Sequence, residues 1–237
     1  MGNIFRFFFL PVTALILISC SHINKQMSCE EILETSYTNS SLNNFEKNKF
    51  KDLLSNRYPE YDLMFQDAAD ETNIEKNLLA AISFQESQWD PKAISNMGVR
   101  GMMMVTLETA ALVGVEKRLN PEQNIKGGAR YFAMLKEKNK IGPTEADQLS
   151  IVLASYNLGP TNIIKVANLV NSNIEEVLWN EIKKELSTIK GEDLSLSDSD
   201  SYTRGQQAID YVDRVKNYYQ LLSAHSCVAP KDQLTFF

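Results

Sequence analysis

Residues 74–104 read IEKNLLAAISFQESQWDPKAISNMGVRGMMM, and this stretch decides how the chain folds. Leu78 and Ile82 stand four residues apart within a longer apolar repeat, which predicts a helix with one apolar face. The helix should end just before Pro91, because proline disfavours helical backbone in the residue that precedes it. Residues 91–104 contain two glycines and little periodicity, so we expect a loop with small irregular or β pieces.

Helical periodicity also dominates the chain beyond this stretch. Asn120 followed by Pro121 is typical of an N-cap and a first helical turn, and Asn173 with Glu176 fits a capping box. Strand signals are almost absent, so a mainly α-helical domain is expected. The expected helices cover 61–72, 74–89, 106–113, 121–140, 145–156, a segment that starts at 160, a segment that ends near 186, and 205–224.

The first 19 residues are typical of an export signal. Arg6 precedes an apolar run over 7–18 that is too short to span a bilayer comfortably. The run ends in LISC at 17–20, which resembles the bacterial lipobox and implies that Cys20 is lipidated after cleavage before it. An ordinary signal peptide with a chance cysteine is the alternative. Ser21 after a lipidated cysteine favours the outer membrane.

The rest of the chain has room for one globular domain and an arm. Residues 20–58 are polar and rich in asparagine and serine, so we interpret them as a tether with one or two possible short helices. The domain is expected to cover 59–228, and 229–237 form a tail.

Charge and composition exclude several functional classes. The formal net charge is −6 and no block of lysine and arginine stands out, which argues against nucleic acid as a partner. His22 and His225 are the only histidines and the three cysteines are far apart, so no metal site is expected. Export would allow Cys29 and Cys227, which flank the domain, to form a disulfide. The sequence leaves a bridge and two free thiols equally open.

Glu86 is the leading candidate for acid–base chemistry. Leu79 and Ile82 stand seven and four residues before it, so all three share one helical face. A carboxyl group on a buried face should have a raised pKa and stay protonated as a general acid. The plain alternative is a glutamate at a helix end that turns outward to solvent.

A series of short motifs resembles the catalytic domain of the soluble lytic transglycosylase and goose-type lysozyme group. The motifs run in order between residues 85 and 212: Gln85-Glu86-Ser87, Trp89-Asp90-Pro91, Gly98 and Gly101-Met102-Met103-Met104, Asn120-Pro121 through Gly127-Gly128, Ala154-Ser155-Tyr156-Asn157-Leu158-Gly159, and Tyr211-Val212. The chain most resembles the branch known as membrane-bound lytic transglycosylase F. That branch usually carries an N-terminal domain similar to a solute-binding protein, for which residues 21–58 are too few.

The resemblance implies a lysozyme-like fold, mainly α with a small β part, and one catalytic carboxyl group. Glu86 would protonate the bond between N-acetylmuramic acid and N-acetylglucosamine in peptidoglycan. It would then act as a base toward the muramic 6-hydroxyl, which closes a 1,6-anhydro ring without water or cofactor. The resemblance further implies substrate contacts from Ser87, Met103, Met104, Tyr156, Asn157 and Tyr211.

Three residues near Glu86 are expected to have structural roles. Asp90 is expected to be a turn residue, and Trp89 is expected to pack inside the domain although it could stack on a sugar. Met102 is expected in the core. A hydrolytic muramidase on the same fold and a non-catalytic wall-binding lipoprotein are the competing functions. In each case the protein would act on the periplasmic side of the cell envelope, anchored through Cys20.

Overall fold

The computed structural model of this protein describes residues 27–96, 98–188 and 204–227. Within these ranges the elements are helices, and pairing between extended residues is limited to isolated bridges. The elements are α1 (Cys29–Asn39), α2 (Asn44–Asn56), η1 (Tyr58–Glu60), α3 (Asp62–Thr72), α4 (Lys76–Ser87), α5 (Leu107–Leu112), α6 (Pro121–Lys138), α7 (Glu145–Leu158), α8 (Pro160–Val170), η2 (Ile174–Glu176), α9 (Trp179–Thr188) and α10 (Arg204–His225). The mainly helical fold and most of the expected helices are confirmed.

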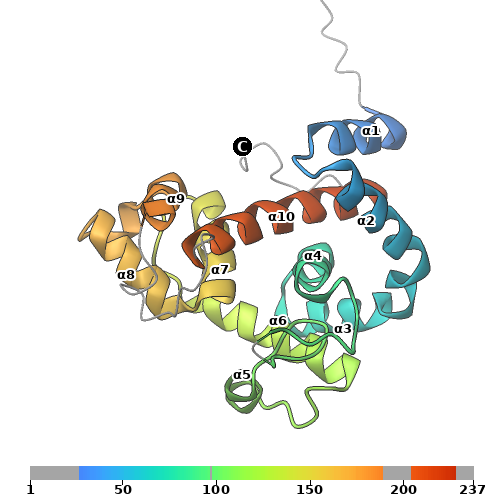
Figure 1. Ribbon diagram of the computed structural model, residues 1–237, viewed down its shortest axis with the longest axis horizontal. Coiled ribbons are helices and arrows are strands. Elements are labelled where there is room, and N and C mark those ends of the chain that lie inside the picture. The colour runs from blue at the N-terminus through green and yellow to red at the C-terminus, as the bar shows by residue number, and fades with distance from the viewer. Residues whose placement is uncertain (1–26, 97, 189–203, 228–237) are drawn as a thin grey trace, which may run out of the picture.

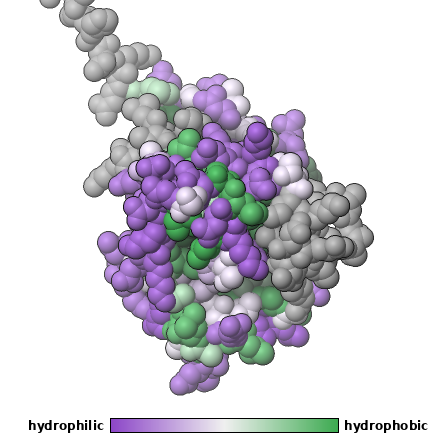
Figure 2. All heavy atoms as spheres, turned by 90° about the vertical axis from the view of Figure 1, so that its left-hand side faces the viewer, coloured by the Kyte–Doolittle hydropathy of each residue, from purple (hydrophilic) through white to green (hydrophobic). Residues whose placement is uncertain are grey.

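The long helix α10 crosses the molecule and organises it (Figure 1). It packs on α4 near its middle, on α7 and α9 at one end, and on α1 at the other. On the far side of α4, helices α3 and α6 form the next layer. Figure 2 shows the face toward α8 and α9, where apolar residues gather among hydrophilic ones.

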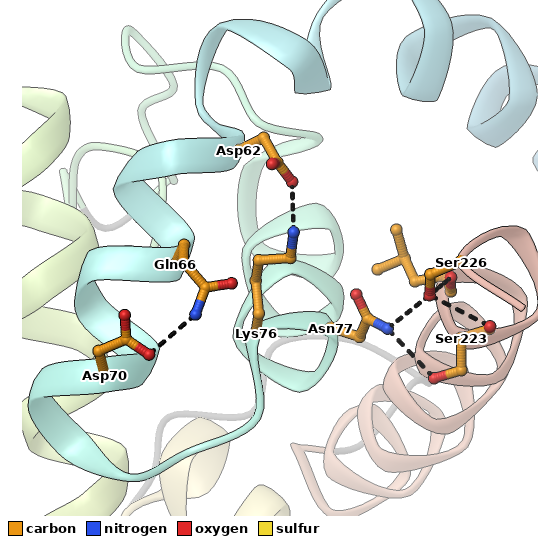
Figure 3. Close-up of polar contacts among 8 residues, drawn as sticks. Asp62, Gln66, Asp70, Lys76, Asn77, Ser223 and Ser226 are labelled. Carbon is orange, nitrogen blue, oxygen red and sulfur yellow. Dashed lines mark hydrogen bonds and ion pairs between the residues drawn. The ribbon is translucent and has the colours of Figure 1, made fainter. Parts of the chain in front are cut away.

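Helix α4 lies in the centre because nearly all of its sides are apolar. Seven consecutive residues, from Leu78 to Phe84, are buried. Polar contacts fix its N-terminal end: Lys76 pairs with Asp62 of α3 at 2.9 Å, and Asn77 donates to Ser226, the residue after α10, at 3.1 Å (Figure 3). The N-terminal end of α4 is thereby held between α3 and the end of α10.

An aromatic cluster fills the space between α2, α4 and α10. The Phe84 ring lies 4.7 Å from Trp89 and 4.5 Å from Tyr218, measured between ring centroids. Trp89 is wholly buried, and its indole N–H donates to the carbonyl of Ala80 at 2.9 Å. Trp89 is therefore a packing residue, as expected from the sequence.

Part of the expected tether belongs to the core. Helices α1 and α2 both begin with capping boxes, and Phe50 of α2 is wholly buried in the aromatic cluster. The boundary drawn at residue 58 is therefore wrong, because α2 supplies a side chain that the core requires. Helix α1 buries no side chain fully, but Cys29 forms a disulfide with Cys227 beyond α10, with 5.3 Å between the Cα atoms.

The loop over 91–104 has the expected small β part. Arg100 forms antiparallel bridges with both Ile94 and Val105. Gly101 has φ of +91°, and a Cβ atom there would come within 2.3 Å of the Asn124 amide nitrogen. The position therefore requires glycine both for its backbone conformation and for the close approach of α6.

The capping box predicted at Asn173 is wrong. Residues 174–176 form a single 3-10 turn, and Asn173 makes no side-chain cap to it. Helix α9 begins later, at Trp179, whose backbone N–H donates to Asp147 of α7 at 2.9 Å. A tertiary contact thus replaces the local cap that the sequence suggested. The predicted signal peptide, Cys20 and the tail from 229 lie outside the described residues.

Candidate active site

Glu86 is the penultimate residue of α4, which packs on α10. Its side chain is partly exposed, and the desolvation of its carboxyl group by the surrounding protein raises its pKa to about 7. The nearby hydroxyl of Tyr211 opposes this shift by stabilising the ionised form. The helix therefore holds a carboxyl group that is largely protonated below neutral pH and can release its proton near neutrality.

Two tyrosines from different helices face this carboxyl group. Tyr156 lies near the end of α7 and Tyr211 lies in the first half of α10. Burial raises the pKa of both phenols well above the usual value, and the charge of Glu86 raises both further. The Tyr211 hydroxyl is buried, and no hydrogen bond of ordinary geometry joins it to Glu86 or to any other described group. It is free to bond a ligand or to tighten onto Glu86.

The loop beside Glu86 is held by Asn124 of α6. The Asn124 side-chain oxygen accepts the backbone N–H of Met103 at 2.7 Å, and its amide nitrogen donates to the carbonyls of Arg100 and Arg118. Tyr156 donates its hydroxyl to the Met103 carbonyl at 2.9 Å. Asn124 is wholly buried. Sequence reasoning placed it in a motif but assigned it no role; a lone asparagine on an apolar helix face was the available signal.

Ser87 secures the same loop from the other side. Its hydroxyl lies 2.8 Å from the carbonyl of Met102 and 3.1 Å from that of Ser83. The Ser83 hydroxyl donates to Met102 as well, at 3.0 Å. Ser87 therefore connects α4 to the loop. Because its hydroxyl hydrogen is already donated, the Ser87 oxygen can only accept a hydrogen bond from a substrate.

The three methionines of the loop have different environments. Met102 is wholly buried, as expected. Met103 was predicted to line a substrate groove, but its side chain is also wholly buried and lies so close to Gly128 that a Cβ atom there would approach it within 2.6 Å. That prediction is wrong: Met103 contributes its backbone groups, which bind Asn124 and Tyr156. Met104 is partly exposed and has φ of +46°.

The sequence predicted that Asn157 contacts the substrate and that Asp90 is a turn residue. The side-chain oxygen of Asn157 is buried, and within the described residues no donor bonds to it. A buried acceptor without a partner costs about 1–3 kcal/mol, which a ligand donor would recover. Asp90 accepts the backbone N–H of Lys92 at 2.9 Å and thus stabilises the turn after α4, as expected.

No metal site is evident in the parts of the chain that the structure describes, since no three His, Cys, Asp or Glu side chains gather there.

Comparison with known proteins identifies the domain. Residues 63–178 match the family model "Transglycosylase SLT domain". The chain is 38% identical over 170 residues to membrane-bound lytic murein transglycosylase F 1 of Alkalilimnicola ehrlichii, covering 71% of this chain and 34% of that protein. It is 39% identical over 170 residues to membrane-bound lytic murein transglycosylase F of Shewanella frigidimarina, covering 71% and 35%. The chain thus spans about a third of the length of these relatives.

The fold has a solved counterpart. The X-ray structure of an inactive mutant of lytic transglycosylase Slt from Pseudomonas aeruginosa superimposes with a TM-score of 0.53 at 16% identity. The match covers 71% of this chain and 24% of that one. At this level of identity the similarity establishes the fold.

Proposed function

We propose that this chain, whose residues 63–178 are a transglycosylase SLT domain, cleaves the glycan strands of peptidoglycan with Glu86 as its single general acid and base. The observation that carries the proposal is the Glu86 carboxyl group at the end of α4, which lies near Tyr156 and Tyr211 and whose pKa is raised to about 7 by desolvation. A pKa near neutrality suits a group that must first donate and then accept a proton.

The first step needs the protonated form of Glu86. The carboxyl group donates its proton to the glycosidic oxygen between N-acetylmuramic acid and N-acetylglucosamine, and the bond from that oxygen to the muramic C1 breaks. The electrons of that bond leave with the oxygen, so positive charge develops at C1 and its ring oxygen. The Glu86 carboxylate that remains lies beside this charge and stabilises it.

The second step returns the proton. The muramic 6-hydroxyl oxygen attacks C1 while the Glu86 carboxylate accepts the hydroxyl proton, which closes a 1,6-anhydro ring and regenerates the acid. Ordinary glycosidases of either stereochemistry use a second carboxylate. Among the described residues, no other carboxylate contributes to the pKa shift of Glu86, which supports a scheme with one carboxyl group.

The remaining groups of the site fit supporting roles. Tyr211 stabilises the ionised form of Glu86 and therefore favours proton release. The unsatisfied oxygen of Asn157 can accept an N–H from an acetamido group of the sugar. Ser87 and the backbone of Met103 hold the loop that flanks the acid, and the partly exposed Met104 is available for an apolar sugar contact.

Mass spectrometry of the reaction products tests this function. Purified protein incubated with peptidoglycan should release fragments that end in 1,6-anhydro-N-acetylmuramic acid, which are lighter by one water than hydrolytic products. Reducing N-acetylmuramic ends would indicate a muramidase, and no soluble fragments at all would indicate a wall-binding protein.

The protein is further proposed to be anchored by a lipid on Cys20 at the periplasmic side of the outer membrane. The LISC sequence at 17–20 supports this, and the relatives are named membrane-bound. None of the helices that the structure describes is long and apolar enough to cross a membrane. Cys20→Ser should move the protein from the membrane fraction to the soluble fraction. Unchanged sedimentation with membranes would reject the lipid anchor.

A further inference from the structure

A separate cavity of about 280 Å³ lies beside the end of α4 that carries Glu86. We call it the α2 pocket, because the first turns of α2 form one wall. The side chains that matter for its chemistry are Phe45, Glu46, Lys49, Gln85, Gln88 and Arg214. The wall opposite α2 comes from the end of α4 and the middle of α10.

The α2 pocket borders the candidate active site along two helices. On α4, Gln85 immediately precedes Glu86. On α10, Arg214 follows Tyr211 by three residues, which is about one turn or roughly 4.5 Å along the helix axis. A polymer bound at Glu86 and Tyr211 therefore has the pocket within reach of its substituents.

The side chains of the pocket favour an anionic ligand. Lys49 and Arg214 contribute two positive charges against the one negative charge of Glu46. Glu46 is already engaged: it accepts the backbone N–H of Asn43 at 2.9 Å and pairs with Arg214 at 3.3 Å. Within the described residues, no carboxylate lies within salt-bridge distance of the Lys49 ammonium group, which lies over the Phe45 ring at 5.9 Å from its centroid.

The uncharged members of the pocket suit a peptide. Gln85 and Gln88 can each both donate and accept, which matches the alternating N–H and C=O groups of a peptide backbone. The Phe45 side chain is 73% exposed, although it stands on a helix whose Phe50 is buried. An exposed ring at the mouth of a polar pocket provides apolar contact area for a ligand.

We propose that the α2 pocket binds the acidic peptide carried by the N-acetylmuramic acid units of peptidoglycan. This inference rests on the proposed function. The peptide carboxylates pair with Lys49 and with the terminal nitrogens of Arg214, whose Nε contacts Glu46, and the peptide backbone bonds with Gln85 and Gln88. The pocket thereby gives the enzyme a preference for glycan strands that bear peptides over strands from which the peptides have been removed.

A comparison of activity on two substrates tests the proposal. The specificity constant kcat/KM is measured on peptide-bearing strands and on strands stripped by an amidase, and their ratio is the readout. Lys49→Gln and Arg214→Gln should each lower this ratio about five-fold, the equivalent of about 1 kcal/mol for one exposed charge pair. Lys47→Gln, on the same helix but outside the pocket, should keep the wild-type ratio. Raising the salt concentration should reduce the wild-type preference.

The outcomes separate the pocket from the catalytic site. If the wild-type protein has the same kcat/KM on both substrates, the peptide site is refuted. It is also refuted if the variants lose the same fraction of kcat/KM on both substrates. Neither result would contradict the proposed cleavage activity. If neither substrate is cleaved, the proposed function fails, and the pocket is then judged by calorimetric titration with the soluble acidic peptide alone. Binding that weakens about five-fold in Lys49→Gln supports the pocket, and absence of binding to the wild type rejects it.

Discussion

The Tyr156 hydroxyl donates a hydrogen bond of 2.9 Å to the backbone carbonyl of Met103, which lies 53 residues earlier in the chain. The N–H of the same residue donates to Asn124 at 2.7 Å. Two helices, α7 and α6, thus fix both backbone polar groups of one loop residue. Because Ser87 ties the preceding carbonyl to α4, the loop cannot move without breaking contacts next to Glu86.

Removing the proton of Glu86 should abolish activity while the fold remains. Glu86→Gln keeps the shape of the side chain but cannot transfer a proton, and general acid–base catalysis contributes on the order of 10² to 10⁴-fold per step. We expect a loss of at least that size in the release of anhydro fragments, with an unchanged circular dichroism spectrum. Asp90→Asn is the control and should be much milder, because Asp90 serves the turn. Substantial turnover by a folded Glu86→Gln protein would refute the mechanism.

The same substitution should change how stability depends on pH. The folded state holds the Glu86 proton more tightly than the unfolded chain does, so wild-type stability falls as pH rises from 4.5 to about 7. The full effect is about 3 kcal/mol at 1.36 kcal/mol per pKa unit. Relative to wild type, Glu86→Gln should therefore gain stability between pH 4.5 and pH 8 in urea titrations. Glu137→Gln, at an exposed position on α6, is the control. A constant difference between Glu86→Gln and wild type would contradict the raised pKa of Glu86.

Removing the side chain of Asn124 should destabilise the loop and the domain together. Asn124→Leu leaves the Met103 N–H and the carbonyls of Arg100 and Arg118 without their partner. We expect a loss of about 3 kcal/mol in the free energy of unfolding, since each buried unsatisfied group costs about 1–3 kcal/mol. Asn168→Ala removes only a contact within exposed α8 and should cost below about 0.5 kcal/mol. Similar stabilities for both variants would show that the Asn124 bonds are dispensable.

Truncating Phe50 should show that α2 belongs to the domain. Phe50→Ala opens a cavity beside Phe84 and Tyr218, and such substitutions cost about 3–5 kcal/mol in buried cores. Phe45→Ala, five residues earlier on the same helix but 73% exposed, should change the free energy of unfolding by about 0.5 kcal/mol or less. If Phe50→Ala were equally mild, the segment before residue 58 would be the simple arm that its composition suggests.

Local signals in the sequence predicted the helices closely. Asn120 caps α6 through the N–H of Gln123, as its position before Pro121 indicated. The failure at Asn173 has a physical cause: the start of α9 depends on Asp147, which lies 32 residues away along the chain. Local capping preferences cannot detect such a partner. The same limit explains why residues 20–58 were interpreted as a tether, since their polar composition conceals the few side chains, Leu42, Phe50 and Tyr58, that are buried in the core.

The sequence by itself determined that the chain is mainly helical, that it carries the ordered motifs of a transglycosylase domain, and that Glu86 shares a face with apolar residues. These features depend on neighbours within a few turns, where periodicity and capping operate. Only the tertiary structure decided that Met103 is buried, that Asn124 holds the loop, and that Tyr156 and Tyr211 meet Glu86. Burial, desolvation and hydrogen bonding between distant segments depend on how the helices pack, and no local pattern of residues encodes that arrangement.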